Sequence, residues 1–205
     1  MAVNRLEIER SLRHALDRNE LELHFQPTVD IATQRVIGAE ALVRWRREDG
    51  TSVGPDAFIR VAEEIGMIRS IGGWVLEEAC TQLAKWKRML GPDRRFTLAV
   101  NLSAHQIADA RIIDEVSSIL RTTGVAPESL CLEITESALL HDLDVALDIV
   151  GRLRGLGVRV ALDDFGTGYS SLRYLQQLPV DVLKIDRSFI SRIGPGSRDS
   201  SIVAR

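Results

Sequence analysis

The chain has 205 residues, 45% of them hydrophobic, and a formal net charge of −3. This length suffices for one large α/β domain or two small ones, and we expect a single domain over residues 1–205. The charge gives no reason to expect a DNA or RNA polymer or a membrane surface as partner, and the cluster of Arg44, Arg46 and Arg47 is too short for a polybasic tail.

Strand-like and helix-like apolar patterns alternate along the chain, which predicts parallel βαβ units. An amphipathic helix is expected over 3–19, with Leu6 in its apolar stripe, a second starts at Gly54 to Asp56, and a third covers 68–90. Six strands are expected, at 21–29, 36–44, 96–102, 130–135, 159–163 and 181–185. The six residues DIATQR between the first two strands are too few for a helical crossover, so this pair forms an antiparallel hairpin.

The cysteines and the N-terminus indicate a cellular compartment. Cys80 and Cys131 lack metal-motif spacing and the density of a disulfide scaffold, which favours buried thiols in a reducing environment. No stretch approaches the roughly 18 apolar residues of a membrane span, and MAVNRLEIER lacks the apolar core of a signal peptide. We therefore expect a cytoplasmic chain without membrane contact.

Polar side chains recur near the ends of the predicted strands. In VRVALDDFGTG an apolar run ends in Asp163 and Asp164, and the two following glycines permit a turn. Further polar residues in comparable positions are Glu40, Asn101, Glu133 and Lys184. Because successive parallel strands end at the same edge of a sheet, this recurrence indicates a constructed site.

The residue types in this set favour a hard divalent cation. The carboxylates of Glu40, Glu133, Asp163 and Asp164 and the amide oxygen of Asn101 are ligands that suit Mg²⁺ or Mn²⁺. Two such cations can activate a water and stabilise a leaving oxygen in phosphodiester hydrolysis. Nothing suggests zinc, because His24, His105 and His141 lack metal-binding spacing to one another.

Each of these residues also has a purely structural alternative. Asp163 and Asp164 are common turn formers, and Glu40 has helix formers on both sides. Asn101 could cap the helix that SAHQIADA begins, and Glu136 could cap the next. Lys184 could be an edge lysine that protects the sheet.

Six sequence segments together carry a family resemblance. They are HFQP at 24–27, EALVRW at 40–45, NLS at 101–103, LEITE at 132–136, DDFGTGYSSL at 163–172 and LKID at 183–186. In order and spacing they resemble the EAL-domain family of cyclic di-GMP phosphodiesterases. The resemblance implies an α/β fold, a modified TIM-like (β/α) barrel with an antiparallel opening strand. It also implies metal-dependent hydrolysis of cyclic di-GMP to linear pGpG.

The resemblance further implies residue roles. Glu40, Asn101, Glu133 and Asp163 would hold one metal, with Asp163 bridging and Asp164 serving a second. Lys184 would lie beside the attacking water, and Glu136 would anchor the loop 165–171 and so hold Asp164 in place.

The same resemblance places three residues in the substrate cleft. They are Gln26 of the HFQP segment and Leu42 and Arg44 of the EALVRW segment. Arg44 would meet a phosphate through a planar, two-pronged contact.

The resemblance breaks off at the end of the sequence. A complete domain of this family would continue through a helix and two strands, bringing another metal-binding glutamate and a later glutamine for substrate, and neither segment is present. We therefore expect a barrel incomplete at the C-terminus. Its exposed strand edges would favour a homodimer. The opening MAVNRLEIER resembles the link after a GGDEF or sensor domain.

Three functions follow from the sequence. The first is a cyclic di-GMP phosphodiesterase that regulates bacterial second-messenger levels, and the second is a catalytically inactive cyclic di-GMP receptor. The third, reached without the resemblance, is an enolate-forming barrel enzyme in which strand-end acids hold Mg²⁺ and Lys184 acts as the base.

Overall fold

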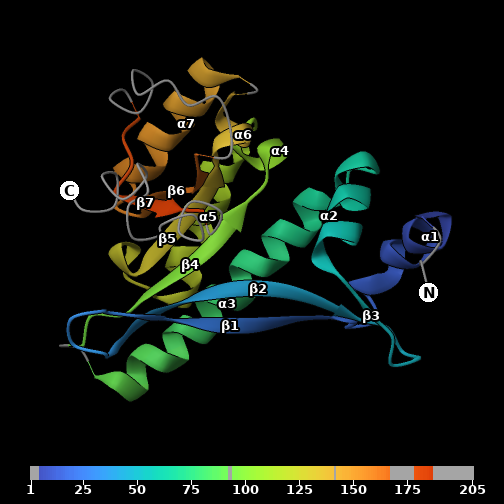
Figure 1. Ribbon diagram of the computed structural model, residues 1–205, viewed down its shortest axis with the longest axis horizontal. Helices are drawn as coiled ribbons and strands as arrows, with labels where there is room; N and C mark the ends of the chain where they lie inside the picture. The colour runs from blue at the N-terminus through green and yellow to red at the C-terminus, as the bar shows by residue number, and fades with distance from the viewer. Residues whose placement is uncertain (1–4, 92–93, 141, 167–177, 187–205) are drawn as a thin grey trace, which may run out of the picture.

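A computed structural model describes residues 5–91, 94–140, 142–166 and 178–186. Its described strands form one sheet in the order β1-β2-β4-β5-β6-β7, with a short β3 paired to β2 (Figure 1). The strands are β1 Leu21–Val29, β2 Val36–Arg46, β3 Ser52–Val53, β4 Thr97–Leu102, β5 Leu130–Thr135, β6 Arg159–Phe165 and β7 Val182–Ile185.

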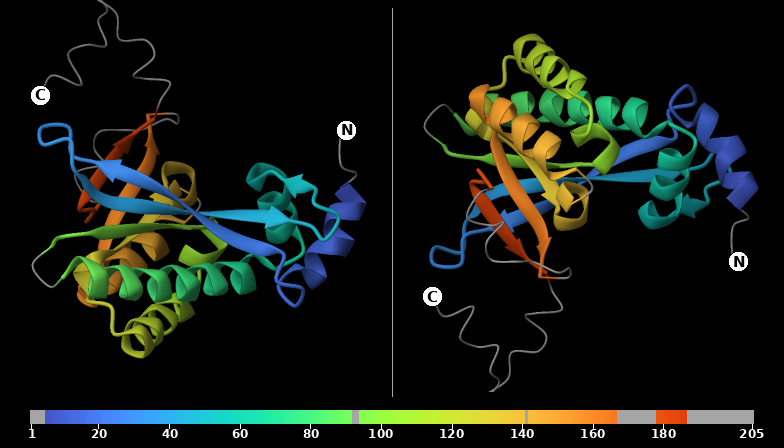
Figure 2. Two further views of the ribbon diagram at one scale, coloured as in Figure 1. Left: turned by 90° about the horizontal axis from the view of Figure 1, so that it is seen from below. Right: turned by 90° about the horizontal axis from the view of Figure 1, so that it is seen from above.

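The longer helices cover one face of the sheet. Figure 2 shows α3, α5 and α7 side by side along the outside of β4, β5 and β6, while α1 and α2 lie at the end of the β1–β2 hairpin away from its tip. The helices are α1 Arg5–Ala15, α2 Pro55–Glu64, α3 Ile68–Leu90, α4 Ala104–Ile107, α5 Arg111–Thr123, α6 Glu136–Leu140 and α7 Leu143–Gly155, and a 3₁₀ turn, η1, covers Pro127–Ser129.

Strand directions agree with the sequence expectations. β1 is antiparallel to β2, and β2, β4, β5, β6 and β7 are mutually parallel, which confirms the opening hairpin and the α/β class. β3 was not predicted, because two residues are too few to show a period. The first helix is shorter than predicted, and placing Leu6 in its apolar stripe was wrong, since Leu6 is 71% exposed.

The core lies between the sheet and these helices. β5 is buried at every position from Leu130 to Ile134, as expected for a parallel strand covered on both faces. The predicted buried thiols, Cys80 and Cys131, are buried and free. No helix in the described part of the chain is long and apolar enough to cross a membrane.

Local signals fix two helix starts beside the sheet. Pro55 opens α2 directly after Gly54, a position where its missing N–H costs no helical hydrogen bond. Ser103 caps α4, since its hydroxyl accepts a hydrogen bond from the Gln106 N–H at 3.3 Å and its own N–H donates to Gln106 Oε1 at 3.1 Å. The alternative that Asn101 caps this helix was therefore wrong.

Asp181 joins β7 to the rest of the sheet. Its carboxylate accepts hydrogen bonds from the Val160 N–H at 2.9 Å and from the Arg154 guanidinium at 2.7 and 3.2 Å. Burial acts to raise the pKa of Asp181, but these hydrogen bonds outweigh it and the pKa lies below its usual range.

We expect Asp181→Ala to lower the free energy of unfolding by about 1–2 kcal/mol at pH 7 in urea denaturation, because it leaves Val160 and Arg154 without their acceptor. Since the folded-state pKa is depressed, this contribution is present above about pH 4 and is lost as pH falls through the folded pKa. Asp148→Ala is the matched control, because Asp148 is 66% exposed and only meets Arg152 at 3.6 Å. Equal effects of the two substitutions would refute the role of Asp181.

Candidate functional site

The strand register places the predicted acidic residues on one face of the sheet. Alternate residues of a strand share a face, and residues paired across neighbouring strands share it too. Glu40 of β2 pairs with Ala99 of β4, and Asn101, two positions further on, pairs with Glu133 of β5. Glu40, Asn101 and Glu133 therefore project from the same face, and Glu40 lies in a strand rather than in a solvated helix.

The next two strands extend this row. Glu133 pairs with Ala161 of β6, and Ala161 pairs with Val182 of β7. Two positions beyond these residues lie Asp163 and Lys184, so both share the face of Glu133.

Three of the carboxylates converge, with one oxygen each of Glu40, Glu133 and Asp163 within 4.8 Å of one another. The Lys184 ammonium donates hydrogen bonds to all three, at 2.6 Å to Glu133, 2.9 Å to Asp163 and 3.2 Å to Glu40. Asn101 Nδ2 donates to Glu40 Oε1 at 2.9 Å, which leaves the amide oxygen available as a ligand. Oxygen donors of this kind fit a hard divalent cation.

Burial sets the electrostatics of this cluster. It raises the pKa of Glu133, whose side chain is 4% exposed, to about 7, although the Lys184 hydrogen bond acts in the opposite direction. Burial would lower the pKa of Lys184, but hydrogen bonds to Asp163 and Glu133 and the nearby negative charges outweigh it and raise that pKa. Lys184 is therefore a charged partner of the acids, and the edge-lysine alternative does not describe it.

Asp164 lies outside the group of three carboxylates, in β6, where the pairing register with β7 shifts between Leu162 and Phe165. Its φ of 55° is in the left-handed region, and its N–H donates to Asp163 Oδ1 at 2.9 Å. Burial, followed by the charge of Asp163, raises the pKa of Asp164. This irregularity interrupts the alternation of side chains between the two faces, so the adjacent carboxylates need not point to opposite faces.

Glu136 contacts the residue that directly follows β6. Its side chain is buried at the start of α6, and Oε2 accepts a hydrogen bond from the Gly166 N–H at 3.2 Å. Gly166 has a φ of 97°, a conformation that favours glycine. Residues 167–171 of the predicted anchored loop lie outside the described residues.

The predicted substrate residues also belong to the face of the acids. Gln26 of β1 pairs directly with Glu40, and Leu42 and Arg44 follow Glu40 at two-residue intervals along β2. Gln26 is exposed, while Leu42 and Arg44 are half-buried. Arg44 donates to the Val43 carbonyl at 2.9 Å.

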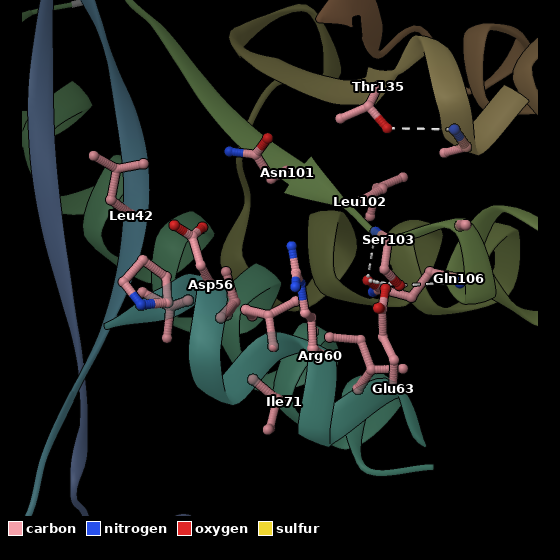
Figure 3. A pocket seen from close by; sticks show the side chains of 18 of the residues that line it. Leu42, Asp56, Arg60, Glu63, Ile71, Asn101, Leu102, Ser103, Gln106 and Thr135 are labelled. Carbon is pink, nitrogen blue, oxygen red and sulfur yellow. Dashed lines mark hydrogen bonds between the residues drawn. The ribbon is translucent and has the colours of Figure 1, made fainter. Parts of the chain in front are cut away.

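A cavity of about 640 Å³ adjoins the cluster, with Asn101 common to both. Figure 3 shows Leu42 and Asn101 on its walls and three charged side chains of α2, Asp56, Arg60 and Glu63, along one side. These α2 residues were not predicted to border the site. Their spacing gives them one polar helix face, but it does not show that this face borders the site.

Comparison with known proteins assigns the family. The family model described as the EAL domain matches residues 9–205. The chain belongs to the EAL domain family. This membership confirms the resemblance found in the sequence.

Two relatives and one solved structure show what this EAL chain is similar to. It is 43% identical over 203 residues to the bifunctional diguanylate cyclase/cyclic di-GMP phosphodiesterase MucR of Pseudomonas aeruginosa, covering 99% of the chain and 29% of MucR. It is 45% identical over 201 residues to the cyclic di-GMP phosphodiesterase NbdA of the same organism, covering 98% and 25%. The chain thus spans less than a third of either relative.

The solved structure is the PaMucR phosphodiesterase in complex with c-di-GMP. The match has a TM-score of 0.87 at 43% identity and covers 97% of this chain and 79% of that one. This similarity confirms the predicted TIM-barrel-like α/β fold.

We expect Lys184→Met to lower the free energy of unfolding by about 2 kcal/mol. The reason is that the three converging carboxylates lose the only cationic side chain that contacts them in the described part of the chain. The loss is smaller than for a fully buried pair, since the Lys184 side chain is 30% exposed. Mn²⁺ should raise the melting temperature of this variant more than that of the parent, because the cation replaces the missing ammonium.

The matched control is Lys85→Met, an exposed lysine of α3. A Lys184→Met protein as stable as the parent and indifferent to Mn²⁺ would contradict a cation position between the acids.

Proposed function

We propose that this chain is the catalytic unit of a metal-dependent phosphodiesterase that hydrolyses cyclic di-GMP to linear pGpG. The observation that carries the proposal is the convergence of Glu40, Glu133 and Asp163 within 4.8 Å, in a chain 43% identical to a phosphodiesterase solved with c-di-GMP. EAL family membership gives no support to the enolate-forming enzyme that the strand-end acids alone permitted.

Mg²⁺ or Mn²⁺ is the proposed cofactor. Glu40, Asn101, Glu133 and Asp163 would hold one ion, and Asp163 and Asp164 would serve a second. Bound divalent ions supply Lewis-acid stabilisation of the phosphoryl and leaving oxygens.

The remaining roles follow from what the side chains do. Lys184 is already a hydrogen-bond donor to three carboxylates, so it acts as a positive charge that orients the nucleophile and offsets charge in the transition state, rather than as a base. Glu136, through Gly166, would hold the segment after Asp164 and so set the direction of that carboxylate. Gln26, Leu42 and Arg44 would position the dinucleotide along β1 and β2.

The primary test is hydrolysis of cyclic di-GMP by the chain with Mn²⁺, with nucleotides separated by ion-exchange chromatography. We expect linear pGpG from the parent, and none from Glu133→Gln or after chelation by EDTA, because both remove the cation from the acids. Glu128→Gln, in the 3₁₀ turn outside the site, is the control and should retain activity. Chelator-insensitive cleavage would overturn the metal-dependent mechanism.

Arg44→Lys keeps the charge but removes the planar fork, so its kinetics test the substrate role of Arg44. We expect kcat/KM for cyclic di-GMP to fall by about tenfold or more, mainly through KM, because one charge-assisted hydrogen bond is worth about 1.5–3 kcal/mol. Arg46→Lys is the control, since Arg46 is exposed at the end of β2 and, unlike Arg44, does not line the cavity. An unchanged KM for Arg44→Lys would remove Arg44 from the binding site.

A cyclic di-GMP receptor without catalysis is the second candidate. One observation favours it: Lys184 contacts all three acids, so the described site has an internal cation. Calorimetry in EDTA separates the two functions, because a receptor keeps its affinity for cyclic di-GMP without divalent ions.

We further propose a linked domain, a homodimer and a cytoplasmic location for this protein. The chain matches 29% of MucR and 25% of NbdA, so both relatives are long enough to carry further domains. This supports a linked GGDEF or sensor domain in the protein. Exposed apolar residues on β7, Leu183 and Ile185, support a homodimer through this edge. Buried free thiols at Cys80 and Cys131 support a cytoplasmic location.

A further inference from the structure

The charged face of α2 is the feature of the cavity that no proposed role explains. Asp56, Arg60 and Glu63 are spaced by one helical turn and line the cavity (Figure 3). Arg60 is exposed, and no hydrogen bond or ion pair joins its guanidinium to another side chain within the described ranges. An arginine directed into a cavity between two acids and paired with neither is available to a ligand.

The cavity lies where one end of the proposed dinucleotide would extend from the metal centre. Asn101 borders both, and Leu42 and Arg44 reach the cavity from the strand that carries Glu40. Its volume of about 640 Å³ is in the range of small-molecule sites. Apolar side chains, Leu42, Ile59, Ile71 and Val75 among them, offer surfaces for the faces of a base.

Charge decides which part of a nucleotide suits this face. The charged side chains that line the cavity, Arg44, Asp56, Arg60 and Glu63, have formal charges that sum to zero, but Arg60 itself is flanked by two carboxylates. These carboxylates disfavour a phosphate at Arg60 and leave an uncharged base as the better ligand there. Guanine presents the acceptors O6 and N7, which match the two-pronged donor geometry of arginine. Its N1–H and N2 amino groups are donors on the side of O6 away from N7, where one of the two flanking carboxylates, Asp56 or Glu63, would be the acceptor.

Adenine fits the same residues poorly. It carries an amino donor where guanine has O6, so an arginine placed for guanine meets a donor instead of an acceptor. A site built around a specific hydrogen bond rejects an analogue that lacks it far more strongly than an apolar pocket does.

We propose that Arg60 selects guanine, by donating two hydrogen bonds to O6 and N7 of one base of the bound dinucleotide. This inference rests on the proposed function, because it needs a cyclic dinucleotide at the metal centre. It deepens that function by assigning base specificity to a residue of α2.

The test compares three dinucleotides with the parent chain, Arg60→Met and Arg60→Lys. Arg60→Met keeps the aliphatic stem and removes every donor. We expect it to lower kcat/KM for cyclic di-GMP by about ten- to a hundredfold, mainly through KM, and to leave cyclic di-AMP nearly unchanged. Cyclic di-IMP keeps O6 and N7 and should respond as cyclic di-GMP does. Arg60→Lys should have a kcat/KM for cyclic di-GMP between those of the parent and Arg60→Met, because lysine keeps the charge but lacks the two-pronged donor geometry of arginine.

Arg121→Met is the matched control, because Arg121 is an exposed arginine of α5 outside the cavity. It should leave the ratios of kcat/KM between the three dinucleotides unchanged. Equal losses for cyclic di-GMP and cyclic di-AMP in Arg60→Met would overturn the inference in favour of a general charge or structural role. The inference would also be overturned if Arg60→Met kept the parent's preference for cyclic di-GMP over cyclic di-AMP.

The failures of the two proposals are distinguishable. If the parent binds but does not cleave, the same ratios are read from dissociation constants by calorimetry, so the inference stands or falls without catalysis. If the parent cleaves cyclic di-GMP and Arg60→Met keeps the guanine preference, only the inference fails. If the parent neither binds nor cleaves any of the three, both proposals fail.

Discussion

The structure depends on holding three carboxylates together against their mutual repulsion. Two unit charges 4.8 Å apart repel by about 3 kcal/mol at an effective dielectric constant near 20, and Glu133 is also almost fully buried. The parallel register of β2, β4, β5 and β6 fixes the backbones so that these side chains must share one face. Lys184, delivered by β7, supplies the compensating charge.

The same geometry explains why the site suits a divalent cation. An ammonium with three carboxylate partners occupies a position where negative charge converges, and Asn101 adds a neutral amide oxygen beside it. A protein that builds such a position on rigid strands, rather than on loops, pre-organises its ligands. The register irregularity at Asp164, next to the Glu136 contact with Gly166, is the part of the site built from irregular backbone.

Around this centre the fold presents two kinds of surface. β1 and β2 carry Gln26, Leu42 and Arg44 on the face of the acids, where under the proposed function they would contact the nucleotide. The helix α2 lines the adjoining cavity with an alternating set of acid, arginine and acid. Phosphate contacts position a ligand and base-edge contacts specify it, and the cavity has the charge pattern for the second task.

Sequence alone determined the α/β class, the six longer strands and the acidic residues near their ends, but not β3, α5 or α7. Apolar runs ending in Asp163, Glu133 and Asn101 identified parallel strands with candidate ligands near one edge, because strand period and turn residues are local properties. The family resemblance, which the EAL domain match confirms, rested on the same segments. The capping box of Ser103 and Gln106 at the start of α4 is likewise a local pattern. Only the tertiary structure decided that Lys184 contacts three acids and that α2 borders the site. These two facts depend on register and packing between segments far apart in the chain, which no local pattern encodes.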